Sequence, residues 1–422
     1  MKFALACYGT RGDVEPSVSI GRELQRRGHE VRLAVPPDLV DFAESAGLSA
    51  VPYGPRLADF LREDFLRHFW SRIFGNPVSA LRELWAPIAE HWSATSTTLM
   101  SLAQHCDLLS TGLNYEQPAA NVAEFYGIPL VTLHHFPMRP NGQLVPALPS
   151  ALVRAGGALS DWLFWWSTRS AEDAQRRELG LPPARVPATR RMARRGVLEI
   201  QAYDAVSVPG LAAEWAGFGD RRPFVGALTM ELPTPSDAEV LEWIAAGTPP
   251  ICFATGSIPV ESPSQTVQMF ASVCSRLGER ALICAGGTDI DGVPEYGHVK
   301  VVGAVNYARV FPACRAIVHH GGSGTTAAVL RAGVPSLVTW SSADQPYWGN
   351  QVKRLKVGTS RRFSHTTPDT LVADLRRILT PDYAVRARAV AARMTDPADS
   401  VVRAADLFET AVECAPGVAH RE

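Results

Sequence analysis

The sequence lacks the features of a disulfide scaffold, a zinc site or a membrane span. Its seven cysteines are an odd number and widely scattered, with no Cys-x-x-Cys pair. This pattern indicates reduced thiols in the cytosol rather than a disulfide framework or a metal site. No run of about 18 uncharged apolar residues occurs, so we expect no transmembrane helix. The apolar start MKFALACYGTRG stops at Tyr8 without a small-residue cleavage site, so we interpret it as a first strand rather than a signal peptide.

The sequence also lacks an excess of charge of either sign. The formal net charge is -1, with 46% hydrophobic and 20% charged residues. This balance excludes a global field that would attract nucleic acid, and it is typical of a globular rather than a disordered chain. We therefore expect a cytoplasmic protein without a nucleic-acid partner.

The distribution of apolar segments predicts an α/β fold. Short apolar segments end in glycine-bearing or polar turns and are followed by stretches with helical spacing, which is typical of a parallel sheet covered by helices on both faces. In the first half we expect strands at 3–8, 30–35, 107–111, 129–134 and 204–208. After Pro249 the pattern restarts, with strands expected at 251–254, 281–285, 299–302, 316–319 and 336–340.

Two domains are expected because 422 residues exceed one ordinary core. We predict two Rossmann-like, doubly wound parallel-sheet domains that face each other across a cleft. Residues 1–215 would form the first and 216–400 the second, with a hinge near 209–235. We expect 401–422 to form a helical tail that packs back on the first domain.

A glycine-rich turn joins an expected strand to an expected helix in AIVHHGGSGTTAAVLRAGVP, residues 316–335. Free N–H groups at a helix start, together with glycines that permit close approach, form an anion site suited to a diphosphate. His320 can donate a hydrogen bond to phosphate, and Thr325 offers a hydroxyl. The alternative is a plain turn with buried histidines. A P-loop is excluded because Gly-Lys-Ser/Thr is absent.

A carboxylate and an amide follow the next expected strand in SSADQPYWGNQV. Asp344 and Gln345 should lie at the carboxyl edge of the sheet, on the same edge as the glycine turn, where ligands bind in open parallel sheets. Both groups accept hydrogen bonds from sugar hydroxyls, and the amide also donates. The alternative is an Asx-type turn before Pro346.

Asp13 lies just beyond the first expected strand, at the start of a helix. A carboxylate at a cleft can take the proton from a hydroxyl that attacks a reactive centre. The alternative is a carboxylate that only interacts with the helix dipole. Arg11 nearby would keep Asp13 ionised, which also lowers its basicity.

Aromatic residues are concentrated in two stretches of the first half. DFLREDFLRHFWSRIFG repeats apolar residues every four positions and predicts an amphipathic helix, while SDWLFWWSTR contributes three tryptophans. Such residues are core in one interpretation. In others they bind a hydrophobic acceptor or contact an anionic lipid surface.

The motifs HHGGSGTTAAVLRAGVP followed by DQP, and YGTRGDVEP at residues 8–16, resemble the nucleotide-sugar glycosyltransferases of the GT-B fold. Within that group the resemblance is to bacterial enzymes acting on glycopeptide antibiotics, macrolides, sterols and cell-envelope glycolipids. MKFALACYGTRGDVEP, GRELQRRGHEV and AVPPDLVDFAESAGLSAVPYG are most similar to mycobacterial glycolipid and glycopeptidolipid glycosyltransferases. The resemblance covers nearly the whole chain in order.

This resemblance implies roles for particular residues. It makes Asp13 the catalytic base. It implies that the donor is bound by Thr10, Arg11, Gly256, Ser257, Val305, Asn306, His320, Gly322, Ser323, Gly324, Thr325, Asp344 and Gln345. Acceptor recognition would lie in the first domain, where the residues considered are His134, His135, Arg139, Phe69 and Trp70.

The implied reaction is inverting and metal-independent. A thymidine or uridine diphosphate sugar, including a deoxysugar such as rhamnose, would donate to a hydroxyl of a hydrophobic acceptor without a further cofactor. The Asp289-Ile290-Asp291 stretch mimics a metal motif but has no third ligand in view. Transient contact with the cytoplasmic membrane face is also expected. The alternatives are a nucleotide-sugar 2-epimerase and a non-catalytic sugar-nucleotide binding protein.

Overall fold

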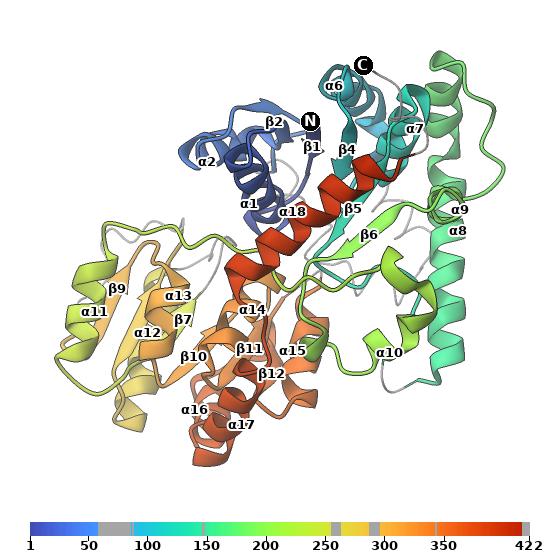
Figure 1. Cartoon of the computed structure of the whole chain (residues 1–422). Coiled ribbons are helices and arrows are strands. Elements are labelled where there is room, and N and C mark those ends of the chain that lie inside the picture. Colours follow the sequence, from blue (N-terminus) through green and yellow to red (C-terminus); the bar gives the residue numbers. More distant parts are fainter. Residues whose placement is uncertain are drawn as a thin grey trace. The chain divides into compact units, whose positions relative to one another are not determined.

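The computed structural model describes residues 1–57, 86, 88–145, 148–254, 263–286, 296–341 and 344–415. The chain forms two compact units (Figure 1). Met1–Thr229 and Thr395–Glu422 make up the first unit, and Met230–Met394 make up the second. The chain therefore leaves the first unit after residue 229, rather than after residue 215, and returns to it at residue 395.

The first unit is built on a six-stranded sheet with the order β3-β2-β1-β4-β5-β6. These strands pair in parallel. They are β1 (Lys2–Ala6), β2 (Glu30–Val35), β3 (Ala50–Pro52), β4 (Leu108–Thr111), β5 (Leu130–His134) and β6 (Leu198–Gln201). The central strands read as continuous apolar runs because helices cover both of their faces.

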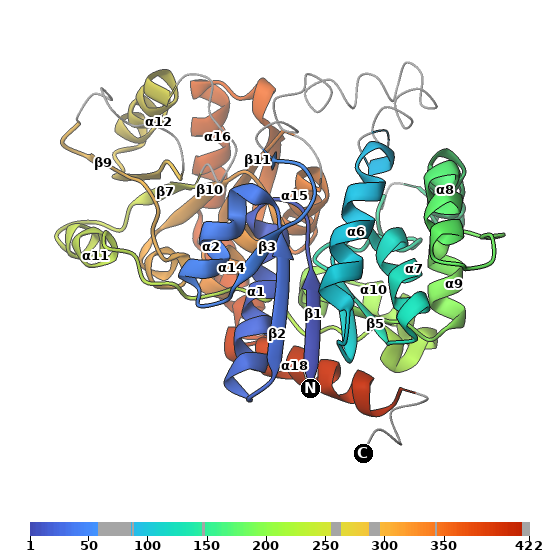
Figure 2. The same ribbon diagram turned by 90° about the horizontal axis from the view of Figure 1, so that it is seen from above.

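Helices of the first unit cover both faces of this sheet (Figures 1 and 2). Side chains alternate along β1, so Ala4 packs in the cluster formed with the helices at 92–103 and 116–126. Leu5 faces the opposite layer, where a Cβ on Gly21 would lie 3.2 Å from its Cδ1 atom. The helices are α1 (Arg11–Arg26), α2 (Val40–Ser45), α6 (Trp92–Ala103), α7 (Glu116–Tyr126), α8 (Ser150–Glu178), α9 (Ala188–Arg194), α10 (Leu211–Trp215) and α18 (Pro397–Glu413).

Helix α18 returns from the second unit and packs beside α1 (Figure 1). Arg27 at the end of α1 lies 2.8 Å from Asp406 and 2.6 Å from Glu409. Phe408 is fully buried, with its ring centroid 6.2 Å from that of Phe3. The last helix thus completes the core of the first unit.

The second unit repeats the architecture, with the strand order β12-β11-β10-β7-β8-β9. Its strands are β7 (Ile251–Ala254), β8 (Ala281–Cys284), β9 (Val299–Val302), β10 (Ala316–His319), β11 (Ser336–Trp340) and β12 (Gly358–Arg362). Its helices are α11 (Asp237–Ala245), α12 (Pro263–Leu277), α13 (Tyr307–Val310), α14 (Ser323–Ala332), α15 (Gln345–Arg354), α16 (Pro368–Ile378) and α17 (Pro381–Ala391). The parallel sheets with covering helices confirm the predicted α/β fold class.

The strand predicted at 204–208 is wrong. Ala205–Ser207 form a 3-10 helix, because the Asp204 carboxylate accepts hydrogen bonds from the backbone N–H groups of Thr395 and Ala227, at 2.7 and 3.3 Å. The edge strand is β6 instead. Its sequence LEIQ does not form an apolar run, because Glu199 is polar although it is buried against Arg222.

Two further edge strands, β3 and β12, were not predicted. Their sequences, AVP and GTSRR, are too short or too polar to form an apolar run. Edge strands are covered on fewer sides, so burial imposes a weaker pattern on them. Among the described residues, no helix has both the length and the apolar character to cross a bilayer.

Truncating Phe408 tests the contribution of α18 to the first unit. We expect Phe408→Ala to lower the free energy of unfolding by about 3–5 kcal/mol, the usual cost of emptying a buried aromatic position. Val402→Ala on the same helix is the control, because Val402 is 41% exposed and should cost about 0.5 kcal/mol or less. Urea denaturation of both variants measures the difference, and equal losses would contradict a core role for Phe408.

Candidate functional site

The turn between β10 and α14 presents the amino end of a helix. Gly322 is the N-cap, and the first intrahelical hydrogen bond runs from Thr326 N to Gly322 O at 2.9 Å. The N–H groups of Ser323, Gly324 and Thr325 precede that bond, so the helix itself does not satisfy them. All three residues are partly exposed. The turn therefore offers backbone donors and the positive end of a helix dipole to an anion.

Gly321 allows this turn to lie against the neighbouring strand and helix. Its φ of +93° is in the region that favours glycine. A Cβ at this position would lie 2.6 Å from Val338 Cγ1 and 3.1 Å from the carbonyl oxygen of Gln345. The close approach brings the β10 turn next to the residues that follow β11.

The two histidines of the turn are neutral at physiological pH. Burial lowers the pKa of His319 to about 3, helped by the neighbouring His320. Burial also lowers the pKa of His320 to about 4, although a hydrogen bond with the backbone of Ala254 favours the charged form. His319 Nδ1 accepts a hydrogen bond from Gly321 N at 3.2 Å. A neutral imidazole has a single N–H, which here is directed to the backbone of Ala254, so a hydrogen bond from His320 to an anion requires that N–H to turn away from Ala254.

Asp344 and Gln345 lie at the end of β11, as the sequence predicts, and local hydrogen bonds fix both side chains. The Asp344 carboxylate accepts from Trp348 Nε1 at 2.9 Å. Gln345 Oε1 accepts from the backbone N–H of Ser341 at 2.8 Å, and the residue is 5% exposed. A carboxylate and an amide thus border the glycine turn, because β10 and β11 are paired in parallel.

Val305 and Asn306 follow β9, and both side chains are engaged in contacts within the second unit. Val305 is part of a hydrophobic cluster of the second unit. The Asn306 side chain caps α13 by accepting from Ala308 N at 3.0 Å, while its backbone N–H donates to Asp237. If this segment contacts the nucleobase of the donor, the contact would therefore involve its backbone groups. Gly256 and Ser257 lie outside the described residues.

In the first unit, Asp13 is held by both of its carboxylate oxygens. Oδ2 accepts from the backbone N–H of Thr10 at 2.6 Å and from its hydroxyl at 3.0 Å. Oδ1 lies 2.8 Å from Nε2 of His135. Gly9 makes room for this arrangement, since a Cβ there would lie 2.3 Å from Asp13 Oδ2. Arg11 is directed to Glu15 instead, at 3.2 Å.

The electrostatics of Asp13 keep it ionised. Burial raises its pKa, but the His135 charge and hydrogen bonds from His135 and Thr10 together outweigh burial, so the pKa lies below its ordinary value. The side chains of Asp13 and His135 remain 21% and 15% exposed. A carboxylate and an imidazole are thus paired, and both reach solvent.

His134 and Arg139 lie inside the first unit rather than at its surface. His134 is fully buried, and its Nε2 atom lies 2.7 Å from a Glu116 oxygen. Arg139 Nη1 contacts the other oxygen of Glu116 at 2.9 Å, and its Nε donates to Glu199. Neighbouring residues leave a strand on opposite sides, so His135 points to Asp13 while His134 points into this network.

No sequence pattern indicated Glu116 and Glu199, which balance the charge of Arg139. Burial raises the pKa of each carboxyl group, but nearby Arg139 and His134 more than compensate, so both pKa values are lowered. Glu116 opens α7 and Glu199 lies in β6. Their partners are distant in the sequence, so only the folded chain reveals the network.

The aromatic stretches divide between described and undescribed residues. Phe69 and Trp70 lie outside the described residues. In SDWLFWWSTR, Trp165 is buried whereas Trp162 and Trp166 are exposed. Asp289 and Asp291 are also outside the described residues, and within the described ranges no group of three His, Cys, Asp or Glu side chains could hold a metal ion.

Two family models match the chain. The "Glycosyltransferase family 28 N-terminal domain" matches residues 3–132, and the "Erythromycin biosynthesis protein CIII-like, C-terminal domain" matches residues 281–410. The chain is also 58% identical over 414 residues to an uncharacterised glycosyltransferase of Mycobacterium tuberculosis. That alignment covers 97% of this chain and 99% of the relative.

Glycosyltransferases are among the solved structures with the same fold. The glycotransferase of kitacinnamycin has a TM-score of 0.72 at 20% identity, covering 97% of this chain and 98% of the other. The spinosyn rhamnosyltransferase complexed with thymidine diphosphate has a TM-score of 0.68 at 16% identity, covering 96% and 100%. Together with the family models and the mycobacterial relative, they show that the chain belongs to the GT-B glycosyltransferases, with a family 28 amino-terminal domain and an erythromycin CIII-like carboxyl-terminal domain.

Proposed function

We propose that this glycosyltransferase moves a sugar from a nucleoside diphosphate sugar to a hydroxyl of a hydrophobic acceptor, with inversion and without a metal. The observation that carries the proposal is the β10 to α14 turn, which combines a helix amino end, three glycines and a neutral imidazole. Thymidine diphosphate in the complex of the related-fold rhamnosyltransferase supports a thymidine or uridine nucleotide.

The donor diphosphate would bind at the amino end of α14. Backbone N–H groups of 323–325 donate to the phosphate oxygens, and the helix dipole stabilises the negative charge that grows as the sugar leaves. His320 would add a hydrogen bond without adding charge once its single N–H turns from the backbone of Ala254 to the phosphate. Asp344 and Gln345 would hold the hydroxyls of the transferred sugar, because they border the same turn.

Asp13 and His135 together would receive the proton of the acceptor hydroxyl. A carboxylate whose pKa is lowered is a weak base by itself. An imidazole titrates near neutrality and is stabilised, once protonated, by an adjacent carboxylate. The 2.8 Å contact therefore supports adding His135 to the base predicted at Asp13. Thr10 would act by fixing the Asp13 carboxylate.

The acceptor would bind in the first unit, with His135 as its polar contact. His134 and Arg139 drop out of this proposal, since their side chains are buried in the Glu116 network. A hydrophobic acceptor such as a glycolipid would place the enzyme in the cytoplasm with transient contact at the membrane face. A paired carboxylate and imidazole that can take the proton of an acceptor hydroxyl favour transfer over donor epimerisation.

Replacing Asp13 tests the base. Asp13→Asn keeps an oxygen that can accept from Thr10 but loses the negative charge, so we expect the turnover rate to fall roughly 10²–10⁴-fold, with donor affinity retained. His135→Gln should also lower turnover. Asp399→Asn is the matched control, because Asp399 is an exposed acid in the first turn of α18. Unchanged turnover in Asp13→Asn, measured by mass spectrometry of the glycosylated product, would remove Asp13 from the mechanism.

Replacing His320 tests the diphosphate site. Loss of a hydrogen bond to a charged group is worth about 1.5–3 kcal/mol, so His320→Ala should weaken binding of a thymidine diphosphate sugar roughly tenfold to hundredfold by calorimetry. His365→Ala removes an exposed histidine of the same unit and should leave affinity unaltered. Equal affinities for the two variants would refute the assigned role.

The neutral state of His320 predicts the pH dependence of donor binding. Because burial lowers its pKa to about 4, the imidazole carries no charge from pH 6 to pH 8. Affinity for an intact sugar nucleotide should therefore be constant over that range in calorimetric titrations. A tenfold gain in affinity on lowering the pH from 8 to 6, absent in His320→Gln, would show that a charged imidazolium binds the phosphate instead.

A further inference from the structure

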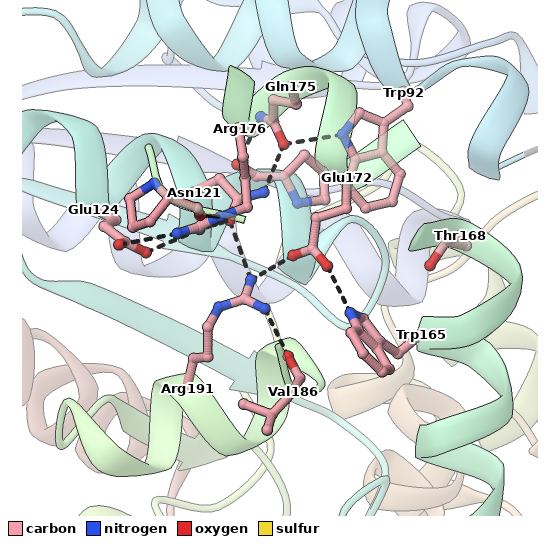
Figure 3. Close-up of polar contacts among 12 residues, drawn as sticks. Trp92, Asn121, Glu124, Trp165, Thr168, Glu172, Gln175, Arg176, Val186 and Arg191 are labelled. Carbon is pink, nitrogen blue, oxygen red and sulfur yellow. Dashed lines mark hydrogen bonds and ion pairs between the residues drawn. The ribbon is translucent and has the colours of Figure 1, made fainter. Parts of the chain in front are cut away.

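Helix α8 has one face fastened to the first unit by a buried polar network (Figure 3). Gln175 Oε1 accepts from Trp92 Nε1 of α6 at 2.9 Å and from Asn121 Nδ2 of α7 at 2.8 Å. Arg176 on the same helix contacts Glu124 of α7 at 3.1 Å. These bonds fix the distance of α8 from the two helices beneath it.

The same network fixes the rotation of α8 about its axis. The Glu172 carboxylate is fully buried, accepts from Trp165 Nε1 at 2.9 Å, and is paired with Arg191 of α9 (Figure 3). Leaving one partner of a buried ion pair unpaired is costly, so α8 cannot turn without a large penalty. The residues on its opposite side therefore stay outward.

That opposite side carries a stripe of large apolar side chains, which we call the α8 stripe. Its members are Leu152, Leu159, Trp162 and Trp166, which are 64%, 60%, 45% and 56% exposed. Spacings of seven, three and four residues place them on one helical face, and the stripe is about 21 Å long. Asp161 is the one acid between its ends, and it lies on the other side of the helix, nine residues after Leu152.

The charge around the α8 stripe is positive, although the whole chain has a formal charge of -1. Residues 150–196, which comprise α8, α9 and their connection, contain nine arginines and four acidic residues. Glu172 is buried and paired with Arg191. Two acids outside this range also pair with its arginines, Glu124 with Arg176 and Arg195, and Glu214 with Arg154. The arginines still outnumber the acids, and Arg190 and Arg194 of α9 are exposed. Figure 2 shows α9 close to α8 within the first unit. The apolar stripe on α8 and the exposed arginines on the neighbouring α9 are the two kinds of side chain that complement an anionic lipid surface.

A second copy of the chain fits the α8 stripe less well. A whole aromatic side chain buries 150–250 Å², so four half-exposed side chains offer roughly 400 Å². A standard protein interface takes about 800 Å² from each partner. Excess positive charge on both copies would also oppose their association. Tryptophan and arginine, by contrast, suit the boundary between lipid headgroups and acyl chains.

We propose that the α8 stripe and the arginines of α9 form the surface by which this enzyme docks on an anionic membrane, with Trp162 and Trp166 entering the headgroup region. This inference extends the acceptor part of the proposed function. It rests on that function in one respect, since a lipid acceptor is the reason for the enzyme to bind a membrane. Docking itself needs neither donor nor transfer.

The test is co-sedimentation of the full chain with vesicles of phosphatidylcholine containing phosphatidylglycerol, and with vesicles of phosphatidylcholine alone. The unchanged protein should bind the anionic vesicles more tightly, and binding should weaken with salt. Trp162→Gln combined with Trp166→Gln should lower the partition coefficient at least tenfold. Arg190→Gln combined with Arg194→Gln should lower it on anionic vesicles by about fivefold per charge, the effect of roughly 1 kcal/mol for each surface arginine.

Phe363→Gln is the control, because Phe363 is 41% exposed in the second unit and should not alter binding. Donor binding by calorimetry should be unchanged in the stripe variants, so a failure of docking is distinguishable from a failure of the proposed chemistry. Equal vesicle binding by the unchanged protein and the Trp162/Trp166 variant would overturn the proposal. The proposal would also be overturned if the unchanged protein did not bind vesicles but formed a concentration-dependent dimer that the tryptophan substitutions abolish.

Discussion

Parallel pairing of β10 with β7 and β11 is the constraint on which the donor site depends. In a parallel sheet the carboxyl ends of the strands meet at one edge. The glycine turn after β10 and the Asp344 region after β11 therefore become neighbours, although Gly321 and Gln345 are 24 positions apart in the sequence. Gly321 makes the contact close, since no larger residue fits between Val338 and the backbone of Gln345.

Burial sets the chemistry of the adjacent histidines in each unit. His134 and His135 leave β5 on opposite sides, so one enters a buried ionic network and the other meets Asp13 at a partly exposed position. His319 and His320 are both neutral because burial lowers their pKa values. In each unit, the environment decides what a His-His pair can do.

The sequence predicted the central strands of both sheets well, because residues buried on two faces leave continuous apolar runs. Prediction failed at the edges. β3 and β12 have little apolar character, and β6 contains a buried glutamate whose charge is balanced by arginines remote in the sequence. At 204–208, the apolar pattern predicted a strand, but the hydrogen bond from the Thr395 backbone N–H to the Asp204 carboxylate favours a different local conformation.

The sequence by itself determined the α/β class, the strand that precedes the glycine turn, and the residue types that can meet a phosphate, a sugar and a proton. Those features are local, since periodicity and turn chemistry act over a few residues. Tertiary structure alone decided that His135 pairs with Asp13 and that Arg139 forms ion pairs with Glu116 and Glu199. It also decided that Trp165 is buried while Trp162 and Trp166 are exposed. The reason is physical: these outcomes depend on which distant side chains share a buried space, and no sequence spacing specifies that.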